Sequence, residues 1–359
     1  MNFLARALRL SGTIGFLPLA AAAQAPVVLT LGGAARLAAE KSAGPEAARF
    51  RVEQAEARVR QRRADFLPSV SGTAGEGERT FNSASFGLDF RDPLTGRSTF
   101  DPNGEVLGPV RTWDVRGTIR QNIADFAAIA RVRAAQAGVA TSSADLSSVS
   151  QHAAAAAATT YIRALRADAL LAARVADSSL ATDLLGIARD QLAAGVGIAL
   201  DVTRAQAQLA TSRAQLIAAR NERGRTRLDL QRALGLPLTA PVELADSLPT
   251  LSTAADNPGA DEATERALRT RADLRAVDAQ ASAGARQLDA IRAERLPALS
   301  AFADKGTTGK NTDHLLNTYT WGLQLSIPVF DGFRRESRMD EQRAVLRELD
   351  VRRRDLAQQ

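Results

Sequence analysis

The sequence predicts a mainly α-helical protein in which long antiparallel coiled-coil hairpins are joined to four amphipathic β-strands. Alanine is abundant and aromatic residues make up only 4% of the 359 residues, a composition that suits close packing between helices. No proline occurs between Pro109 and Pro237, so this stretch can form long helices. Two short stretches alternate apolar and polar residues, and this period of two indicates strands.

The composition argues against several kinds of site. The chain has no cysteine and only two histidines, His152 and His314, which leaves no disulfide, thiolate metal site or histidine cluster. The net charge of +6 comes mostly from arginines that alternate with acidic residues along helices, a pattern typical of a solvated helix face. No catalytic pair, metal-ligand spacing or phosphate-binding loop is found, so we expect no enzyme, no cofactor and no nucleic-acid binding.

The N-terminus predicts export from the cytoplasm. Arg6 and Arg9 precede an apolar run over residues 10–23, which ends in a small-x-small pattern at residues 23–25. This arrangement predicts a signal peptide over residues 1–25, with the mature chain starting near Pro26. No other segment is long and apolar enough for a membrane helix, so insertion after export would require β-strands.

The first elements of the mature chain are two helices and two strands. A short helical piece covers residues 29–44, and a helix from about Pro45 to Phe66 stops at Pro68. Residues 69–79 are predicted to form a strand, and residues 80–110 are rich in turn-forming dipeptides and predict an exposed loop. Residues 112–121 alternate, which predicts a second strand. Its apolar face carries Trp113, Val115 and Ile119.

Two long helices follow. The helical pattern runs from Phe126 to Leu192, for which about 1.5 Å per residue predicts a rod of roughly 100 Å, and again from about Ile198 to Leu234. Both helices carry heptad seams of small and branched apolar residues. The seam positions are Val132, Ala135, Val139, Ser142, Leu146 and Val149 in one helix, and Val202, Ala205, Leu209, Ser212, Leu216 and Ala219 in the other. Gly235 and Pro237 are expected to end the second helix.

The same unit then recurs. The sequence RADFLPSVSGTAG (63–75) matches RAERLPALSAFAD (292–304), with a proline before a strand in each. The alternating stretch at 317–327 corresponds to the one at 112–121, and its apolar face carries Tyr319, Trp321, Leu323, Leu325 and Ile327. We therefore predict a first repeat over residues 26–235, an irregular linker over 236–260 and a second repeat over 261–359. The second repeat is expected to be incomplete, because a full copy would extend beyond Gln359.

The strands have the properties of membrane-crossing strands. Each has about nine to eleven residues, one apolar face and aromatic residues toward an end, which suits a bilayer. Four strands cannot close a barrel, so further copies of the chain would have to complete it. Alternation alone is equally compatible with a half-buried antiparallel sheet beside a helical bundle.

The order of these features resembles the TolC-type outer-membrane efflux channels. The segments that carry the resemblance span nearly the whole mature chain. They are residues 29–71, QLAAGVGIALDVTRAQAQLATSRAQL (191–216), LDLQRALGLP (228–237), RTRADLRAVDAQ (269–280), ERLPALS (294–300) and QLSIPVFDGF (324–333).

The resemblance implies a homotrimer with a twelve-stranded transmembrane barrel in outer-membrane lipid and a periplasmic helical tunnel. Such a channel is a passive conduit in a tripartite efflux or type I secretion system. It works with a periplasmic adaptor (membrane fusion protein) and an inner-membrane transporter. A periplasmic coiled-coil adaptor is the alternative, although an adaptor needs no duplicated amphipathic strands. The cargo stays open, and the residues that close the tunnel would lie beyond Gln359.

The resemblance also implies an adaptor-docking tip where the two long helices meet. The expected tip residues are Gly195, Val196, Gly197, Leu200 and Asp201. Both glycines are expected to permit the backbone angles of the reversal, and Asp201 is expected to cap the returning helix.

Overall fold

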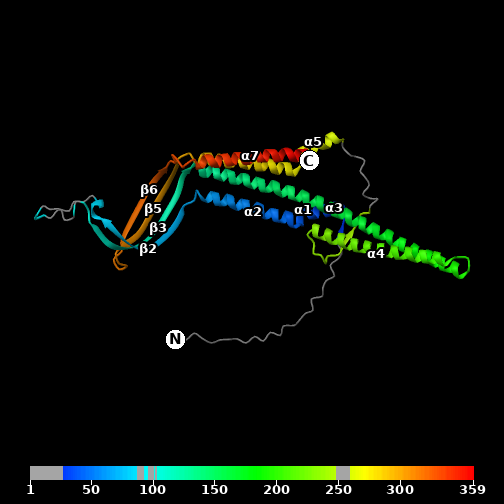
Figure 1. The fold of residues 1–359 in the computed structure, drawn as a ribbon. Coiled ribbons are helices and arrows are strands. Elements are labelled where there is room, and N and C mark those ends of the chain that lie inside the picture. Colours follow the sequence, from blue (N-terminus) through cyan, green and yellow to red (C-terminus); the bar gives the residue numbers. More distant parts are fainter. Residues whose placement is uncertain (1–26, 87–92, 96–100, 102, 248–258) are drawn as a thin grey trace, which may run out of the picture. The chain divides into compact units, whose positions relative to one another are not determined.

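The computed structural model describes residues 27–86, 93–95, 101, 103–247 and 259–359. The predicted signal peptide, residues 1–25, lies outside the described residues, as do residues 248–258 of the predicted linker. The fold is mainly helical with antiparallel strands, as expected from the sequence (Figure 1).

The elements follow the predicted order closely. The helices are α1 (Leu31–Lys41), α2 (Ala43–Ala64), α3 (Phe126–Ala193), α4 (Ala199–Ala233), α5 (Ala260–Thr270), α6 (Ala272–Ala293) and α7 (Arg334–Gln358). The strands are β1 (Val27–Leu29), β2 (Ser69–Asn82), β3 (Val106–Asp125), β4 (Val242–Leu244), β5 (Ala298–Gly309) and β6 (Leu316–Ser326), with a short 3₁₀ helix at Ser83–Phe86.

Two local predictions were wrong. Strands β2 and β3 both continue into the stretch predicted as loop, where Phe81 pairs with Leu107 and Asn82 with Val106, because cross-strand pairing outweighs the local turn propensity. The region predicted as an irregular linker contains β4, which pairs in parallel with β1. Strands of three residues are too short to show a period, so the sequence pattern does not reveal this pair.

The chain divides into two compact units. Of the described residues, the first comprises 27–42 and 154–247, and the second comprises those between 43 and 153 together with 259–359. Helix α3 contributes residues to both units. These spatial units differ in kind from the sequence repeats, whose boundaries stay a prediction.

The core of the first unit surrounds Tyr161 of α3. Its side chain is fully buried among apolar residues of α1, α4, β1 and β4. The Tyr161 hydroxyl lies 2.9 Å from the carbonyl oxygen of Leu29 and 3.0 Å from a carboxylate oxygen of Asp246. The same carboxylate oxygen accepts a 2.7 Å hydrogen bond from the amide of Leu31 at the start of α1. This network ties the segment after β4 to the start of the described chain.

Helices α3 and α4 form an antiparallel hairpin within the first unit. Ala181 and Leu185 of α3 pack against Leu209 of α4, with Val202 and Ala205 beside them. These α4 residues are part of the predicted heptad seam, so that part of the seam is confirmed. At the other end of α4, Gly235 has a φ of 69°. Its amide and that of Leu236 donate to the carbonyls of Arg232 and Gln231, and this Schellman motif ends the helix as predicted.

Four helices of the second unit lie side by side in the order α2, α3, α6, α7. A Cβ on Gly44 of α2 would lie 3.3 Å from Val149 of α3. Thr141 of α3 donates to the carbonyl of Ala279 in α6 at 3.1 Å. Leu288 and Ile291 of α6 form a buried cluster with Met339 of α7. The order matches that of the strands to which these helices connect.

The four long strands form one antiparallel sheet in the order β2-β3-β5-β6 (Figure 1). The helix-to-strand junction recurs in both halves of the chain. Residues 65–67 and 294–296 make the same three hydrogen bonds, each to the carbonyl three residues earlier. Pro68 and Pro297 follow them directly, and a strand begins after each proline. Strand β3 pairs with β5, so the two halves meet inside the sheet.

Candidate functional site

The register of the sheet gathers the predicted apolar strand positions on one face. Residues directly opposite each other in an antiparallel pair share a face. Val70, Ile119, Ala303 and Trp321 lie opposite one another across the four strands. The same face continues through Val115 on β3 and through Leu323 and Leu325 on β6.

The large residues of this face are exposed in the single chain. Trp321 and Tyr319 are each 75% exposed. The other predicted positions on β3 and β6 are also exposed, except Trp113, which is half-buried. The exposed positions are Val115, Ile119, Leu323, Leu325 and, just after β6, Ile327. A continuous apolar face of this size on a protein surface indicates a contact with lipid or protein.

Charged residues on the apolar face were missed by the sequence interpretation. Glu76 of β2 lies opposite Trp113 on this face. Lys305 lies opposite Gly117 on one side and Tyr319 on the other. Its side chain is exposed. A lysine at such a position can lay its methylene stem on the apolar surface and direct its ammonium group toward water. Alternation within β5 is weak, so only the pairing with β6 shows which face Lys305 occupies.

The opposite face of the sheet is polar and internally paired. Arg116 of β3 forms ion pairs with Asp114 and with Asp304 of β5. It also donates a 3.3 Å hydrogen bond to Thr318 of β6. Gly306 lies directly opposite Arg116, and a Cβ at Gly306 would collide with the β3 backbone. The absent side chain lets the two strands approach closely beside Arg116.

Further apolar side chains cluster where β6 leads into α7. Val329, Phe330 and Phe333 are 90%, 73% and 66% exposed. The rings of Phe330 and Phe333 meet edge to face with centroids 5.5 Å apart. Phe333 has a φ of 61°, a left-handed conformation that is uncommon for a bulky residue. These residues were not among the predicted site positions, because they follow the strand and break its alternation.

The tip between α3 and α4 is a Schellman motif. Gly195 has a φ of 74°, its amide donates to the carbonyl of Leu192 at 3.1 Å, and the amide of Val196 donates to the carbonyl of Gln191 at 3.0 Å. This pairing satisfies the last carbonyls of α3. Val196 is 81% exposed, and Ile198 and Leu200 are also exposed. The tip therefore presents apolar side chains to its surroundings.

Two expectations about the tip were wrong in detail. Gly197 does not have a positive φ. Its role is steric, because a Cβ there would lie 3.0 Å from the amide nitrogen of Leu192. Asp201 does not cap α4, because Ile198 occupies the N-cap position without a side-chain hydrogen bond. Asp201 lies in the first turn of α4 instead, with its carboxylate 3.7 Å from the Arg204 guanidinium. A negative charge in the first turn interacts favourably with the helix dipole.

Comparison with protein families matches residues 36–236 and 263–359 to the outer membrane efflux proteins. The chain belongs to the outer membrane efflux protein family. This membership bears out the resemblance to TolC-type channels. A search of curated proteins found no match.

Solved structures of bacterial outer membrane proteins share the fold of this family member. The CmeC outer membrane channel of Campylobacter jejuni superposes with a TM-score of 0.70 at 16% identity, covering 91% of this chain and 67% of CmeC. VceC of Vibrio cholerae gives 0.65 at 18% identity, with coverage of 91% and 75%. The MtrE channel of Neisseria gonorrhoeae gives 0.64 at 17% identity, with coverage of 91% and 70%.

Two of these structural neighbours, CmeC and MtrE, are outer membrane channels. Across the residues that the structure describes, no helix combines the length and the apolar character needed to cross a bilayer.

Proposed function

We propose that this protein is an outer-membrane channel that serves as a passive conduit in a tripartite efflux or type I secretion system. Membership of the outer membrane efflux family supports the proposal. The observation that carries it is the two-faced sheet. One face carries exposed apolar residues of β2, β3 and β6, and the other holds the Arg116 ion-pair cluster. Such a sheet suits a wall between lipid and water.

The edges of the sheet support assembly as a homotrimer. Among the described residues, β2 pairs only with β3 and β6 pairs only with β5. An unpaired strand edge in hydrocarbon leaves backbone groups without hydrogen bonds, which costs several kcal/mol per group. Copies of the chain, joined edge to edge, would satisfy these groups and close the barrel.

The apolar face is proposed to contact outer-membrane lipid. Its lipid-facing positions are Trp113, Val115, Ile119, Tyr319, Trp321, Leu323, Leu325 and Ile327. Phe330 and Phe333 would add aromatic rings at the boundary between lipid and the aqueous periplasm, where such rings are favoured. The helices would then lie in the periplasm.

The tip is proposed to dock a periplasmic adaptor, which links the channel to an inner-membrane transporter. Gly195 and Gly197 shape the reversal, and Val196 and Leu200 present apolar surface. Asp201 adds a charge beside it. A hairpin tip with this composition suits helix-to-helix contact with an apolar partner surface.

Extraction behaviour tests the channel against the adaptor alternative. We expect the full-length protein to stay in the outer-membrane fraction after carbonate washing and to migrate as a heat-modifiable trimer. A protein that washes off as a monomer would contradict the channel and favour the adaptor.

Charge substitution tests the tip. Val196→Glu and Leu200→Glu are expected to abolish efflux while the trimer still assembles, because a carboxylate in an apolar contact is costly. Gln208→Glu on exposed α4 surface is the matched control and should retain efflux. Normal efflux by both tip variants would remove the docking role.

A further inference from the structure

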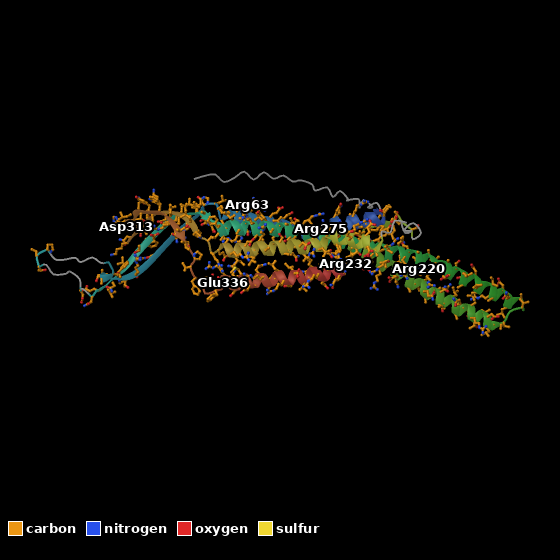
Figure 2. The ribbon with its side chains drawn as sticks, turned by 90° about the horizontal axis from the view of Figure 1, so that it is seen from above. Arg63, Arg220, Arg232, Arg275, Asp313 and Glu336 are labelled. Atoms are coloured by element: carbon orange, nitrogen blue, oxygen red, sulfur yellow. The ribbon has the colours of Figure 1, made fainter. Side chains whose placement is uncertain are left out.

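An arginine-rimmed cavity lies among the four helices of the second unit. It has a volume of about 450 Å³ and is lined by side chains of α2, α3, α6 and α7. This volume lies within the range of small-molecule sites, roughly 300–1,000 Å³. The four helices form a layer in which α2 and α7 lie at the two edges. Both edge helices can border one space only if the layer curves around it, so the cavity lies on the concave face of the layer. Figure 2 labels Arg63 of α2 and Glu336 of α7 on these two outer helices.

The cavity carries unbalanced positive charge. Four arginines and one glutamate line it: Arg58, Arg62, Arg131, Arg338 and Glu294. Arg338 is paired with Glu294 at 2.7 Å, and Arg131 with Asp125 at 3.0 Å. Arg58 and Arg62 form no ion pair with any residue that the structure describes.

Arg58 and Arg62 are placed so that both can bind the same ligand. Arg58 and Arg62 are four residues apart on α2, so they share a helix face, where like charges repel. An anion between them would remove that repulsion. Guanidinium groups bind carboxylate and phosphate oxygens in pairs of hydrogen bonds. The helix dipole offers another reason for Arg62, because Arg62 lies in the last turn of α2, where a positive charge is favoured. Arg58 lies before the last turn, so the dipole does not explain it.

The floor of the cavity is made of small residues that leave room for a ligand. Ala134 and Gly138 of α3 lie there, and a Cβ placed on Gly138 would meet no atom within 4 Å. The first carbon of a side chain at Gly138 would therefore enter open space beside the cavity.

We propose that this cavity binds small multivalent oxyanions, such as solutes with several carboxylate or phosphate groups. Its position on the tunnel wall rests on the proposed function, in which the concave face of each chain lines the channel. Three copies would then form a ring of anion sites along the path of the cargo.

The binding test uses the purified full-length protein in detergent and tripolyphosphate as the probe. Isothermal titration at low ionic strength should show saturable binding. Arg58→Gln with Arg62→Gln should weaken binding by at least about tenfold, because two charge-assisted contacts are lost. Arg60→Gln with Arg63→Gln removes the same charge from exposed positions of α2 outside the cavity and should change affinity by less than about twofold.

Gly138→Leu distinguishes binding of tripolyphosphate inside the cavity from nonspecific electrostatic attraction to the arginines. It leaves the charge unchanged and fills the cavity, so binding should also fall. No binding by the wild type, equal loss in the two arginine pairs, or full binding by Gly138→Leu would each overturn the proposal. The oligomeric state is measured on the same sample. A trimer that does not bind tripolyphosphate contradicts the anion site alone, whereas a monomer contradicts the proposed channel.

Discussion

Arg116 of β3 and Asp304 of β5 form an ion pair that joins the two halves of the chain across the middle of the sheet. Their side chains are 26% and 15% exposed. The same arginine holds Asp114 at 2.9 Å and reaches Thr318 of β6. One guanidinium group therefore links three strands of the sheet.

Loss of this arginine should weaken the proposed trimeric barrel. Arg116→Met leaves the carboxylates of Asp114 and Asp304 without their shared counter-charge, so the proposed trimer should dissociate at a lower temperature on semi-denaturing gels. Arg116→Lys should recover only part of the loss, because an ammonium group does not reproduce the planar fork of hydrogen bonds. Arg120→Met, on the same strand and without an ion pair among the described residues, is the control. Equal dissociation temperatures for Arg116→Met and Arg120→Met would contradict the clamp.

The two kinds of glycine in the α3–α4 hairpin should respond oppositely to alanine. Gly195→Ala forces a left-handed backbone on an L-residue and should destabilise the hairpin by about 1 kcal/mol. Gly224 is exposed within α4, and a Cβ there meets no atom within 4 Å. Gly224→Ala should stabilise the hairpin by about 0.5–1 kcal/mol. Thermal unfolding followed by circular dichroism measures both, and a loss in the Gly224 variant comparable to that at Gly195 would refute the distinction.

Removal of the Tyr161 hydroxyl should loosen the first unit. Tyr161→Phe keeps the buried ring but removes the hydroxyl beside Leu29 and Asp246. The expected cost is about 1 kcal/mol, seen as a lower unfolding temperature. Tyr319→Phe, at an exposed position, serves as the control and should have little effect on this transition.

Tyr161 also predicts a loss of stability at high pH. Burial raises the pKa of Tyr161, and the neighbouring Asp246 carboxylate adds to this effect. The folded protein therefore keeps this proton at pH values where the unfolded chain, with a tyrosine pKa of about 10, releases it. Tyr161 therefore makes its full contribution to the free energy of unfolding below pH ~10. This contribution is lost as pH rises through the pKa of Tyr161 in the folded protein. Denaturation between pH 9 and 12 should show a smaller decline for Tyr161→Phe than for the wild type; equal declines would exclude Tyr161 as the source.

Asp273 should contribute to stability at neutral pH but not in strong acid. Hydrogen bonds from Arg271, the shorter at 2.7 Å, lower the pKa of Asp273, although burial acts in the opposite direction. Asp273 therefore contributes to the free energy of unfolding above about pH 3.9, the pKa of an aspartate in the unfolded chain. This contribution is lost as pH falls through the lower pKa of Asp273 in the folded protein. Asp273→Asn should cost about 0.5–1 kcal/mol at pH 7 and leave a flatter profile below pH ~4.

The control for this acid effect is Asp289→Asn. Asp289 lies on the same helix with a 50% exposed side chain in its ion pairs with Arg286 and Arg292. An exposed pair contributes little, so this variant should behave like the wild type. An acid loss in Asp273→Asn as steep as that in Asp289→Asn would contradict the role given to Arg271.

The helices and their ends were predictable because local chemistry decides them. The long helix predicted from Phe126 ends at Ala193, one residue beyond the predicted Leu192, and Gly235 closes α4 in a left-handed turn. The repeated proline at positions 68 and 297 located the start of a strand each time. Capping, backbone freedom and the missing proline amide are properties of a few adjacent residues, so they can be read without knowing the rest of the fold.

The positions on the apolar face of the sheet were partly predictable. Alternation identified the apolar residues of β3 and β6, because neighbouring side chains of a strand point to opposite faces. It did not show that Lys305 joins that face, since β5 alternates weakly. It also missed Phe330 and Phe333, which follow the strand at the junction with α7.

By itself the sequence determined the long helices, the start of each long strand after a proline and the apolar face of each clearly alternating strand, because these depend on residues close together in the chain. Only the tertiary structure decided which strands are neighbours, how Arg116 meets Asp304, and that four separate helices enclose an arginine-lined cavity. Those relationships join residues that are far apart in the chain, and their geometry is set by packing and register, which no local pattern encodes.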